Sequence, residues 1–217
     1  MGARLFLASE GLGALPAFLR EHARGGRTAF VPTAANRLPD AKWVARVRAE
    51  VAGMGLTLRD LDLERARPGE AAEALADVDA IVVSGGDPFH VLRCARASGF
   101  GLAARRALEA GAVYVGQSAG AIVAAPDLRP IVLTSPFAPR PGESLDGLAL
   151  AAVLVLPHDD RPGRAERNRR AQEAHGAEVR MVALADDRAL EIVDEGERIV
   201  SSPGARAAGP PARPARE

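Results

Sequence analysis

Residues 116–120 constrain the fold of this chain more than any other segment. They read Gly-Gln-Ser-Ala-Gly, follow the apolar run 112–115, and lead into the apolar run 121–125, which can continue as a helix. A sharp turn that lifts one side chain upward crowds the residues on either side, so glycine fits best there. The pattern therefore predicts a strand, a tight turn and a helix, with Ser118 at the turn.

Ser118 has two interpretations in this setting. A serine in a loop of small residues is often only the cap of the following helix. It can also be a nucleophile, because the free N–H groups and the positive dipole end of the helix face any oxyanion that forms on it. The strand before the motif and the helix after it favour the nucleophile.

The single cysteine, Cys94, lies in a helical-looking stretch and is expected to be a buried small hydrophobe.

Short apolar runs alternate with longer helical patterns along the chain. The strands expected in the first part are residues 5–8, 28–31, 56–58, 80–84 and 112–115. The helical patterns between them are residues 12–23, 42–54, 70–76 and 89–110. Such alternation predicts an α/β fold of three layers, with a mostly parallel sheet and helices on both faces. Of the later strand candidates, 153–156, 179–184, 189–193 and 198–200, the last three predict an antiparallel edge or hairpin.

The composition is that of an ordinary soluble globular protein. The chain has 217 residues, with 28 Lys+Arg balanced by 28 Asp+Glu, so we expect neither a nucleic-acid nor a membrane partner. The N-terminal apolar run is too short for a signal peptide, and a cytoplasmic location is expected. We predict a single catalytic domain over residues 1–203 and a disordered tail rich in Pro, Ala and Arg over residues 204–217. A homodimer is left open.

A serine hydroxyl needs a base to remove its proton, and histidine is the usual base near neutral pH. The chain has four histidines, of which His22 and His175 lie in polar helical stretches. His158 directly follows the apolar run 153–156, which should place it at the carboxyl ends of the strands, where sites gather in open α/β sheets. We therefore expect His158 to be the base for Ser118.

A histidine base usually has a carboxylate that orients it. Asp160 stands two residues beyond His158, which places its side chain on the same side of an extended segment. We therefore choose Asp160 on geometry, ahead of its neighbour Asp159 and the more distant Asp127. Asp159 or Asp160 could instead cap the helix expected to start near residue 163.

The segment Gly-Gly-Asp-Pro at 85–88 follows another strand end. Acyl transfer usually needs two donors aimed at the developing oxyanion, and we expect the backbone N–H groups of Gly86 or Asp87 to join that of Ala119. A phosphate-binding loop is the alternative, but the segment matches neither G-x-x-x-x-G-K-S/T nor G-x-G-x-x-G. His90, just beyond this turn, either lines the site or simply starts a helix.

Five arginines between residues 161 and 170 form a basic cluster just after His158. Such clusters are usually a solvated helix face, and Glu166 and Glu173 balance part of the charge. Arg164 and Arg167 lie one helical turn apart near the expected site, where an arginine can bind a substrate carboxylate. RNA binding is disfavoured because the stretch has no aromatic residue. We expect no cofactor and no metal, since no cluster of His, Cys and carboxylate residues stands out.

These segments together resemble peptidase family S51, which comprises the alpha-aspartyl dipeptidases (dipeptidase E) and the cyanophycinases. The resemblance is carried by Gly-Gly-Asp-Pro-Phe at 85–89, Gly-Gln-Ser-Ala-Gly-Ala at 116–121 and Leu-Pro-His at 156–158. It spans about residues 4–200 and includes the opening strands. It implies a fold similar to the class I glutamine amidotransferases, with Ser118 as nucleophile, His158 as base and the Gly86–Asp87 turn in the oxyanion hole.

The chain departs from the family pattern at two places in the site. Asp87 stands where the family usually has Asn, a mild change because the donor would be the main chain. In the dipeptidases an aspartate follows the serine at a position where this chain reads Ile-Val-Leu-Thr-Ser, residues 131–135, without a carboxylate. Asp160 could take over, the site could work as a dyad, or the peptidase activity could be lost. The family arginine that reads the aspartyl side chain would fall near Arg164 or Arg167.

The function predicted from these residues and this resemblance is hydrolysis of a small peptide at an N-terminal aspartyl residue, through an acyl-enzyme on Ser118. Two alternatives stay open: a binding protein of the same fold with a vestigial site, and an esterase or amidase with the same serine turn. In a true α/β-hydrolase the acid lies between serine and histidine along a longer chain, which argues against that fold. An Asp-X dipeptide, a polymer such as cyanophycin and another acidic peptide would all satisfy an arginine that reads a carboxylate.

Overall fold

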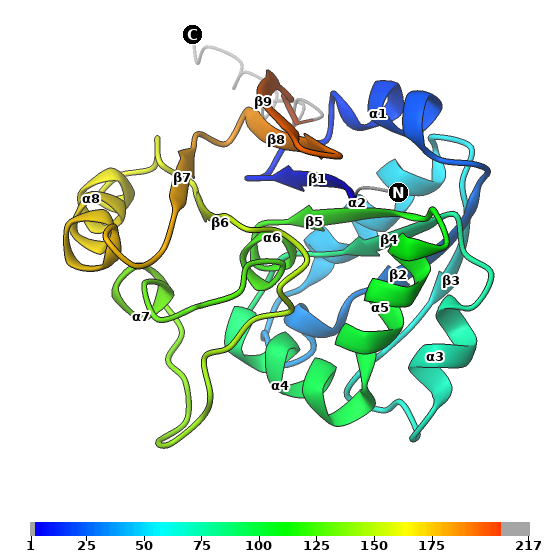
Figure 1. Cartoon of the computed structure of the whole chain (residues 1–217), viewed down its shortest axis with the longest axis horizontal. Helices are drawn as coiled ribbons and strands as arrows, with labels where there is room; N and C mark the ends of the chain where they lie inside the picture. The colour runs from blue at the N-terminus through cyan, green and yellow to red at the C-terminus, as the bar shows by residue number, and fades with distance from the viewer. Residues whose placement is uncertain (1–2, 205–217) are drawn as a thin grey trace, which may run out of the picture.

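A seven-stranded sheet runs through the protein in this computed structural model, which describes residues 3–204 (Figure 1). The strands are β1 Arg4–Ala8, β2 Arg27–Val31, β3 Thr57–Asp60, β4 Ala80–Val83, β5 Val113–Gln117, β8 Arg188–Val193 and β9 Gly196–Ser201. They stand in the order β3-β2-β4-β5-β1-β8-β9. Pairs among β1 to β5 are parallel, whereas β8 pairs antiparallel with β1 and β9. The predicted α/β fold with a mostly parallel sheet and an antiparallel edge is confirmed.

Helices cover both faces of this sheet (Figure 1). They are α1 Leu15–His22, α2 Lys42–Ala52, α3 Glu70–Leu75, α4 Pro88–Ser98 and α5 Phe100–Glu109. Helices α1 and α2 share one buried apolar cluster with Phe6 of β1, and α3, α4 and α5 share a second cluster with Leu5 and Leu7 of the same strand. Successive side chains of a strand point to opposite faces, so β1 contributes to both layers of the core.

The helical pattern predicted over residues 89–110 is two helices rather than one. Gly99 ends α4 and begins α5 with a φ of 71°, in the left-handed region that glycine adopts without strain. Apolar spacing continues across this position, because both helices bury a face against the same side of the sheet. The glycine, rather than the spacing, marks the break.

Two further strands lie outside the main sheet. They are β6 Leu154–Pro157 and β7 Met181–Leu184, which pair in parallel. The prediction that residues 179–184 join the antiparallel edge is therefore wrong. The physical reason is α8 Arg164–His175, a helix long enough to provide the crossover that a parallel pair requires. Figure 1 shows β6, β7 and α8 together on one side of the main sheet.

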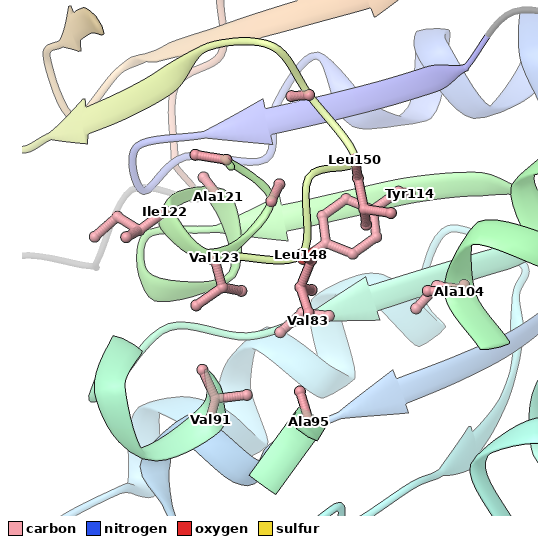
Figure 2. Packing of buried hydrophobic residues seen from close by; sticks show 14 of the residues in the cluster. Val83, Val91, Ala95, Ala104, Tyr114, Ala121, Ile122, Val123, Leu148 and Leu150 are labelled. Atoms are coloured by element: carbon pink, nitrogen blue, oxygen red, sulfur yellow. The ribbon is translucent and has the colours of Figure 1, made fainter. Parts of the chain in front are cut away.

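The helix that follows the serine turn, α6 Ala119–Val123, is buried along its whole length (Figure 2). Its side chains belong to an apolar cluster with Val83 of β4, Tyr114 of β5 and Val91 of α4. The Tyr114 hydroxyl donates a 2.7 Å hydrogen bond to the carbonyl of Gly120. Interiors packed at this density allow little displacement. The turn before α6 is therefore held by the core on several sides.

Two short helices, η1 Thr33–Ala35 and α7 Ile131–Thr134, complete the elements used below. No helix within residues 3–204 is long and apolar enough to cross a membrane. Of the predicted tail, residues 205–217 lie outside the described residues.

Candidate active site

Ser118 occupies the turn between β5 and α6 in a backbone conformation that is rare for a residue with a side chain. Its φ is 49° and its ψ is −106°. A Cβ on Gly116 would lie 2.5 Å from the carbonyl oxygen of Gly120, and a Cβ on Gly120 would lie 2.1 Å from that of Val83. Both glycines are therefore required by close backbone approach. Strained backbone at a polar residue is typical of functional sites.

His158 follows β6 and also has a positive φ, of 65°. Its backbone N–H donates to Oγ of Ser9 over 2.8 Å, which fixes the chain at this point. Its Nε2 lies 2.9 Å from Oγ of Ser118, and its side chain is 9% exposed. The fold thus places these two residues, 40 positions apart in sequence, within direct proton-transfer distance.

Asp186, in the loop between β7 and β8, holds the other nitrogen of His158. Its Oδ1 lies 2.6 Å from Nδ1, and its Oδ2 accepts a 2.7 Å hydrogen bond from Nε of Arg161. Partial burial raises the pKa of Asp186, but hydrogen bonds from His158 and Arg161 outweigh it and bring the pKa below its ordinary value. The ionised carboxylate accepts a hydrogen bond from the Nδ1–H group, which leaves the Nε2 lone pair free for the Ser118 hydroxyl.

The prediction that Asp160 orients the ring of His158 is wrong. Its Oδ1 accepts a 2.9 Å hydrogen bond from the backbone N–H of Asp186, so it positions the loop that carries the carboxylate. Alternation of side chains fails here because the positive φ of His158 interrupts the extended segment. Asp186 was missed, although it follows the apolar run 179–184 at a strand end, the same signal that identified His158.

Of the three residues predicted to supply backbone donors to an oxyanion, Ala119 directly follows Ser118 and Gly86 lines the same cavities as Ser118. Ala119 is the first residue of α6, where a backbone N–H has no partner within the helix. Gly86 has a φ of 138°, and a Cβ there would lie 2.3 Å from the carbonyl oxygen of Ala34. The prediction fails for Asp87, because its N–H donates to that same carbonyl over 2.8 Å. Its side chain caps α4 instead.

Two cavities meet at the Ser118–His158 pair. The larger, of about 370 Å³, extends over α2, and the smaller, of about 140 Å³, extends toward α7 and α8. Gly86, Ser118, His158 and Arg161 line both. A molecule whose reacting bond lies at Ser118 therefore has room on either side of that bond.

Arg164 lies half-buried in the smaller cavity, at the start of α8. Its Nη1 donates to the carbonyl of Thr134 over 2.6 Å, and no carboxylate within residues 3–204 forms an ion pair with it. Burial and the neighbouring cations of Arg167 and Arg161 lower the pKa of its guanidinium. Arg167, in the next turn of α8, is exposed and lines neither cavity.

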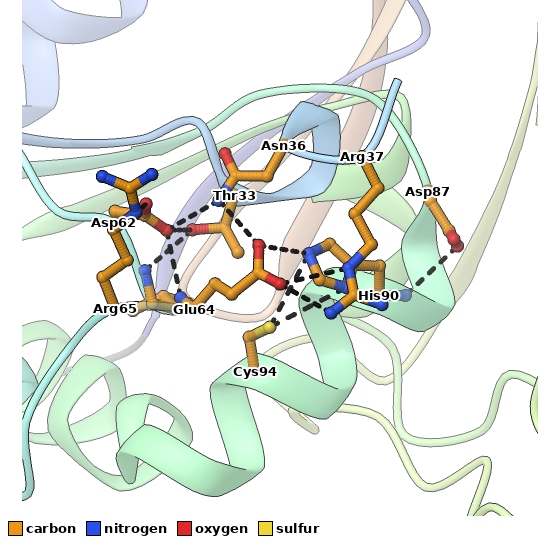
Figure 3. Close-up of polar contacts among 10 residues, drawn as sticks. Thr33, Asn36, Arg37, Asp62, Glu64, Arg65, Asp87, His90 and Cys94 are labelled. Carbon is orange, nitrogen blue, oxygen red and sulfur yellow. Dashed lines mark hydrogen bonds and ion pairs between the residues drawn. The ribbon is translucent and has the colours of Figure 1, made fainter. Parts of the chain in front are cut away.

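The prediction that His90 lines the site is wrong. Its side chain, 1% exposed, turns into a polar cluster between α4 and the loop after β3 (Figure 3). Its Nε2 lies 3.2 Å from Oε2 of Glu64, which also binds Arg37. The Sγ of Cys94 lies 3.8 Å from Nε2 and 3.9 Å from Nδ1 of the same ring. Cys94 is buried, as predicted.

Glu10, His158 and Asp186 place three potential metal-ligand atoms within 4.8 Å of one another. Arg161 forms ion pairs with both Glu10 and Asp186. Its guanidinium therefore supplies the positive charge between the two carboxylates. These residues therefore support the ring of His158 through ion pairs and a hydrogen bond.

A half-buried serine that lines two cavities on a strand-to-helix turn, with a histidine and an ionised carboxylate in line behind it, defines a hydrolase of the serine type. The model of the family described as peptidase family S51 matches residues 8–200. The protein therefore belongs to peptidase family S51 and is a serine peptidase, as its sequence motifs predict.

Relatives of known sequence agree with this assignment, and solved structures agree with the fold. Peptidase E of Streptomyces coelicolor is 33% identical over 152 residues, which are 69% of this chain and 58% of that protein. An uncharacterized peptidase of Listeria monocytogenes is 28% identical over 157 residues, 71% of this chain and 77% of that protein. A crystal structure from L. monocytogenes, provisionally described as a peptidase E protein, has a TM-score of 0.80 at 23% identity and covers 93% of this chain and 99% of its own. A peptidase from an acI-B1 actinobacterium has a TM-score of 0.72 at 20% identity, covering 95% and 93%.

Proposed function

We propose that this peptidase hydrolyses small peptides at an N-terminal aspartyl residue, through an acyl-enzyme on Ser118. The observation that carries the proposal is the continuous chain of hydrogen bonds from Ser118 through His158 to Asp186, at the meeting point of two cavities. A hydroxyl, a base and an orienting carboxylate in this arrangement supply what acyl transfer requires.

In the proposed mechanism Ser118 Oγ attacks the carbonyl carbon as its proton passes to Nε2 of His158. The imidazolium that forms is stabilised by the Asp186 carboxylate at Nδ1. The backbone N–H groups of Ala119 and Gly86 bind the oxyanion of the tetrahedral intermediate. His158 then gives its proton to the leaving amine, and the same histidine activates the water that hydrolyses the acyl-enzyme.

The smaller cavity supports an acidic side chain on the acyl side of the scissile bond. Its volume of about 140 Å³ suits a short side chain, and Arg164 is a half-buried cation without a carboxylate partner among residues 3–204. A carboxylate buried without a partner is strongly disfavoured, so selectivity for aspartate needs a fixed cation. We therefore assign the aspartyl side chain to Arg164 rather than to the exposed Arg167.

The first alternative is a binding protein with a vestigial site. Its support from sequence is the lack of a carboxylate at residues 131–135. Asp186 provides a carboxylate to His158 from another loop, which favours an active enzyme. An esterase or amidase would share the serine turn, but the unpaired Arg164 beside it favours an acidic peptide.

We further propose that residues 1–203 form one catalytic domain that acts on peptides in the cytoplasm. A homodimer remains the assembly to test. Cell fractionation and size-exclusion chromatography with light scattering address these two points.

The experiment for the aspartyl assignment is a screen of Asp-X, Glu-X and neutral dipeptides against the wild type, Arg164→Ala and Arg167→Ala. Arg164→Ala should raise the KM for Asp-X by about tenfold or more, because it removes a charge-assisted hydrogen bond, and should change the KM for neutral peptides little. Arg167→Ala is the matched control from the same helix and should change either KM by less than about threefold. Equal effects on all substrates, or no preference for Asp in the wild type, would leave a serine peptidase and overturn the aspartyl assignment.

A further inference from the structure

The larger cavity, like the smaller one, is lined by an arginine without an ion-pair partner among residues 3–204. Arg46 of α2 lines this cavity, and its side chain forms no ion pair or hydrogen bond with any group of residues 3–204. The other arginine there, Arg161, already pairs with Glu10 and Asp186. Each cavity beside the reacting serine therefore contains one arginine whose charge no carboxylate of the described chain neutralises.

Arg46 belongs to a continuous face of α2. Trp43, Arg46, Val47 and Glu50 line the cavity, at spacings of three, four and seven residues that bring side chains to one side of a helix. Val47 is 4% exposed and anchors this face in the apolar cluster of β1 and α1. Arg46 is itself exposed, and the helix that carries it is held in place by this buried neighbour.

The tryptophan connects this helix face to the serine turn. The Cη2 atom of Trp43 would lie 3.5 Å from a Cβ on Gly85, and that same Cβ would lie 3.2 Å from Cβ of Ser118. Gly85 therefore has no side chain between the indole ring and Ser118. The Trp43 ring is thus close to Ser118, and Arg46 lies one helical turn further along α2.

We propose that the larger cavity binds the leaving residue of a dipeptide, with its C-terminal carboxylate on Arg46 and its side chain against Trp43 and Val47. The inference rests on the proposed function and deepens it. An Asp-X dipeptide carries two carboxylates, one on each side of the scissile bond, and the two cavities place one arginine on each side. A guanidinium binds a carboxylate with two parallel hydrogen bonds, which also fixes the orientation of the leaving amine near His158.

Glu50 sharpens the prediction, because it lies one turn beyond Arg46 on the same face and has no partner among the described residues either. Its carboxylate opposes the binding of a second negative charge nearby. Arg46 and Glu50 should therefore have opposite effects on a substrate with a free C-terminus.

The test compares the free acids and C-terminal amides of two dipeptides, Asp-Leu and Ala-Leu. In the wild type the free acid should have a KM about tenfold below that of its amide, in both pairs. Arg46→Gln should abolish this difference by raising the KM of the acids alone, and Glu50→Gln should lower the KM of the acids by about two- to threefold. Arg48→Gln is the matched control, since Arg48 is on the same helix but pairs with Asp60 and lines neither cavity.

The two comparisons separate the inference from the function on which it rests. A preference for Asp-Leu over Ala-Leu tests the aspartyl assignment. A preference for the free acid over the amide tests whether Arg46 binds the C-terminal carboxylate. Equal KM values for acid and amide in the wild type would overturn the inference. The inference would also be overturned if Arg46→Gln raised the KM of the acid and of the amide to the same extent, because Arg46 would then have a structural role only.

Discussion

Two histidines in this molecule have the same kinds of neighbours and different surroundings. His158 lies between a serine hydroxyl and the carboxylate of Asp186, which is itself bound by an arginine. His90 lies beside the Cys94 thiol and the carboxylate of Glu64, which is also bound by an arginine (Figure 3). Each group contains a nucleophilic atom, an imidazole, a carboxylate and a guanidinium. Residue types alone do not distinguish them.

Geometry and access separate the two groups. The Ser118 oxygen lies 2.9 Å from one ring nitrogen of His158, while Asp186 lies 2.6 Å from the other. The Cys94 sulfur is 3.8–3.9 Å from both ring nitrogens of His90, so it is not in line with one of them as the Ser118 oxygen is with Nε2 of His158. Burial, and then the Glu64 carboxylate, raise the pKa of the Cys94 thiol, which disfavours the reactive thiolate.

The group around His90 therefore acts as a structural support. Glu64 connects Arg37, in the loop after η1, to His90 on α4. The turn with Gly86 lies between η1 and α4 and is tied to η1 by the bond from the Asp87 N–H to Ala34. The comparison teaches that a catalytic group needs an aligned lone pair and a cavity, whereas the same residue types around the buried His90 ring hold neighbouring elements together.

The largest predicted effect separates the two nucleophilic atoms. Ser118→Ala should lower kcat/KM for a cleaved dipeptide by about 10⁴-fold or more, because no acyl-enzyme can form. Cys94→Ala should keep kcat/KM within about threefold of the wild type and cost about 1 kcal/mol of stability. Steady-state kinetics, with circular dichroism as the folding control, check both variants. If both variants lost activity to a similar extent, the catalytic role could not be assigned to Ser118 rather than Cys94, and the comparison would be contradicted.

The next effect concerns the carboxylates around His158. Asp186→Asn should lower kcat by about 10²–10⁴-fold, because a neutral amide does not stabilise the imidazolium and its NH2 group can donate to Nδ1, which favours the tautomer protonated at Nε2. Asp160→Asn is the matched control and should lower kcat by less than about tenfold, since its amide oxygen still accepts from the Asp186 N–H. Single-turnover kinetics of both variants measure the effect on the chemical step. A greater loss for Asp160→Asn would restore the prediction made from sequence.

The third prediction concerns stability and pH. Hydrogen bonds from Arg37 and Asn36 lower the pKa of Glu64 from 4.5 to about 2. A carboxyl group whose pKa is lower in the folded than in the unfolded protein stabilises the fold when the pH is above its unfolded pKa. This contribution is therefore complete above pH 4.5 and is lost as the pH falls toward 2. Because the Glu64 side chain is 30% exposed, solvent screening limits this contribution to about 1 kcal/mol.

Glu64→Gln should therefore lower the unfolding free energy at pH 7 and flatten its dependence on pH between 5 and 2, with a small effect on kcat. Denaturant titrations over this range measure both quantities. Glu109→Gln, on the exposed side of α5, is the control and should change the unfolding free energy by less than about 0.5 kcal/mol. An unchanged pH dependence in Glu64→Gln would remove the structural role assigned to this cluster.

Most of the sheet could be predicted from the sequence because its strands are apolar runs with helical patterns between them. Two features could not. Gly99 divides a helical pattern whose apolar spacing continues across it. Residues 179–184 pair with β6 because α8 gives a parallel crossover, and an apolar run carries no information about its partner strand.

Site residues could be predicted from the sequence where a reactive residue type follows a recognisable apolar strand. Ser118 and His158 each follow an apolar strand, and the fold brings the ends of those strands together. Asp186 is 28 residues beyond His158, so local alternation favoured Asp160 instead. His90 was misplaced because a helix start gives no sign of which face turns inward.

The most direct test of the account is the rate at which a fluorophosphonate labels the protein, followed by intact mass and peptide mapping. The account predicts a single adduct on Ser118, with labelling slowed by about 10²-fold or more in His158→Ala and in Asp186→Asn. Glu64→Gln should label at the rate of the wild type. An unlabelled wild type, or an adduct on Ser118 that forms equally fast without His158 and Asp186, would contradict the claim that this serine is activated by the two residues behind it.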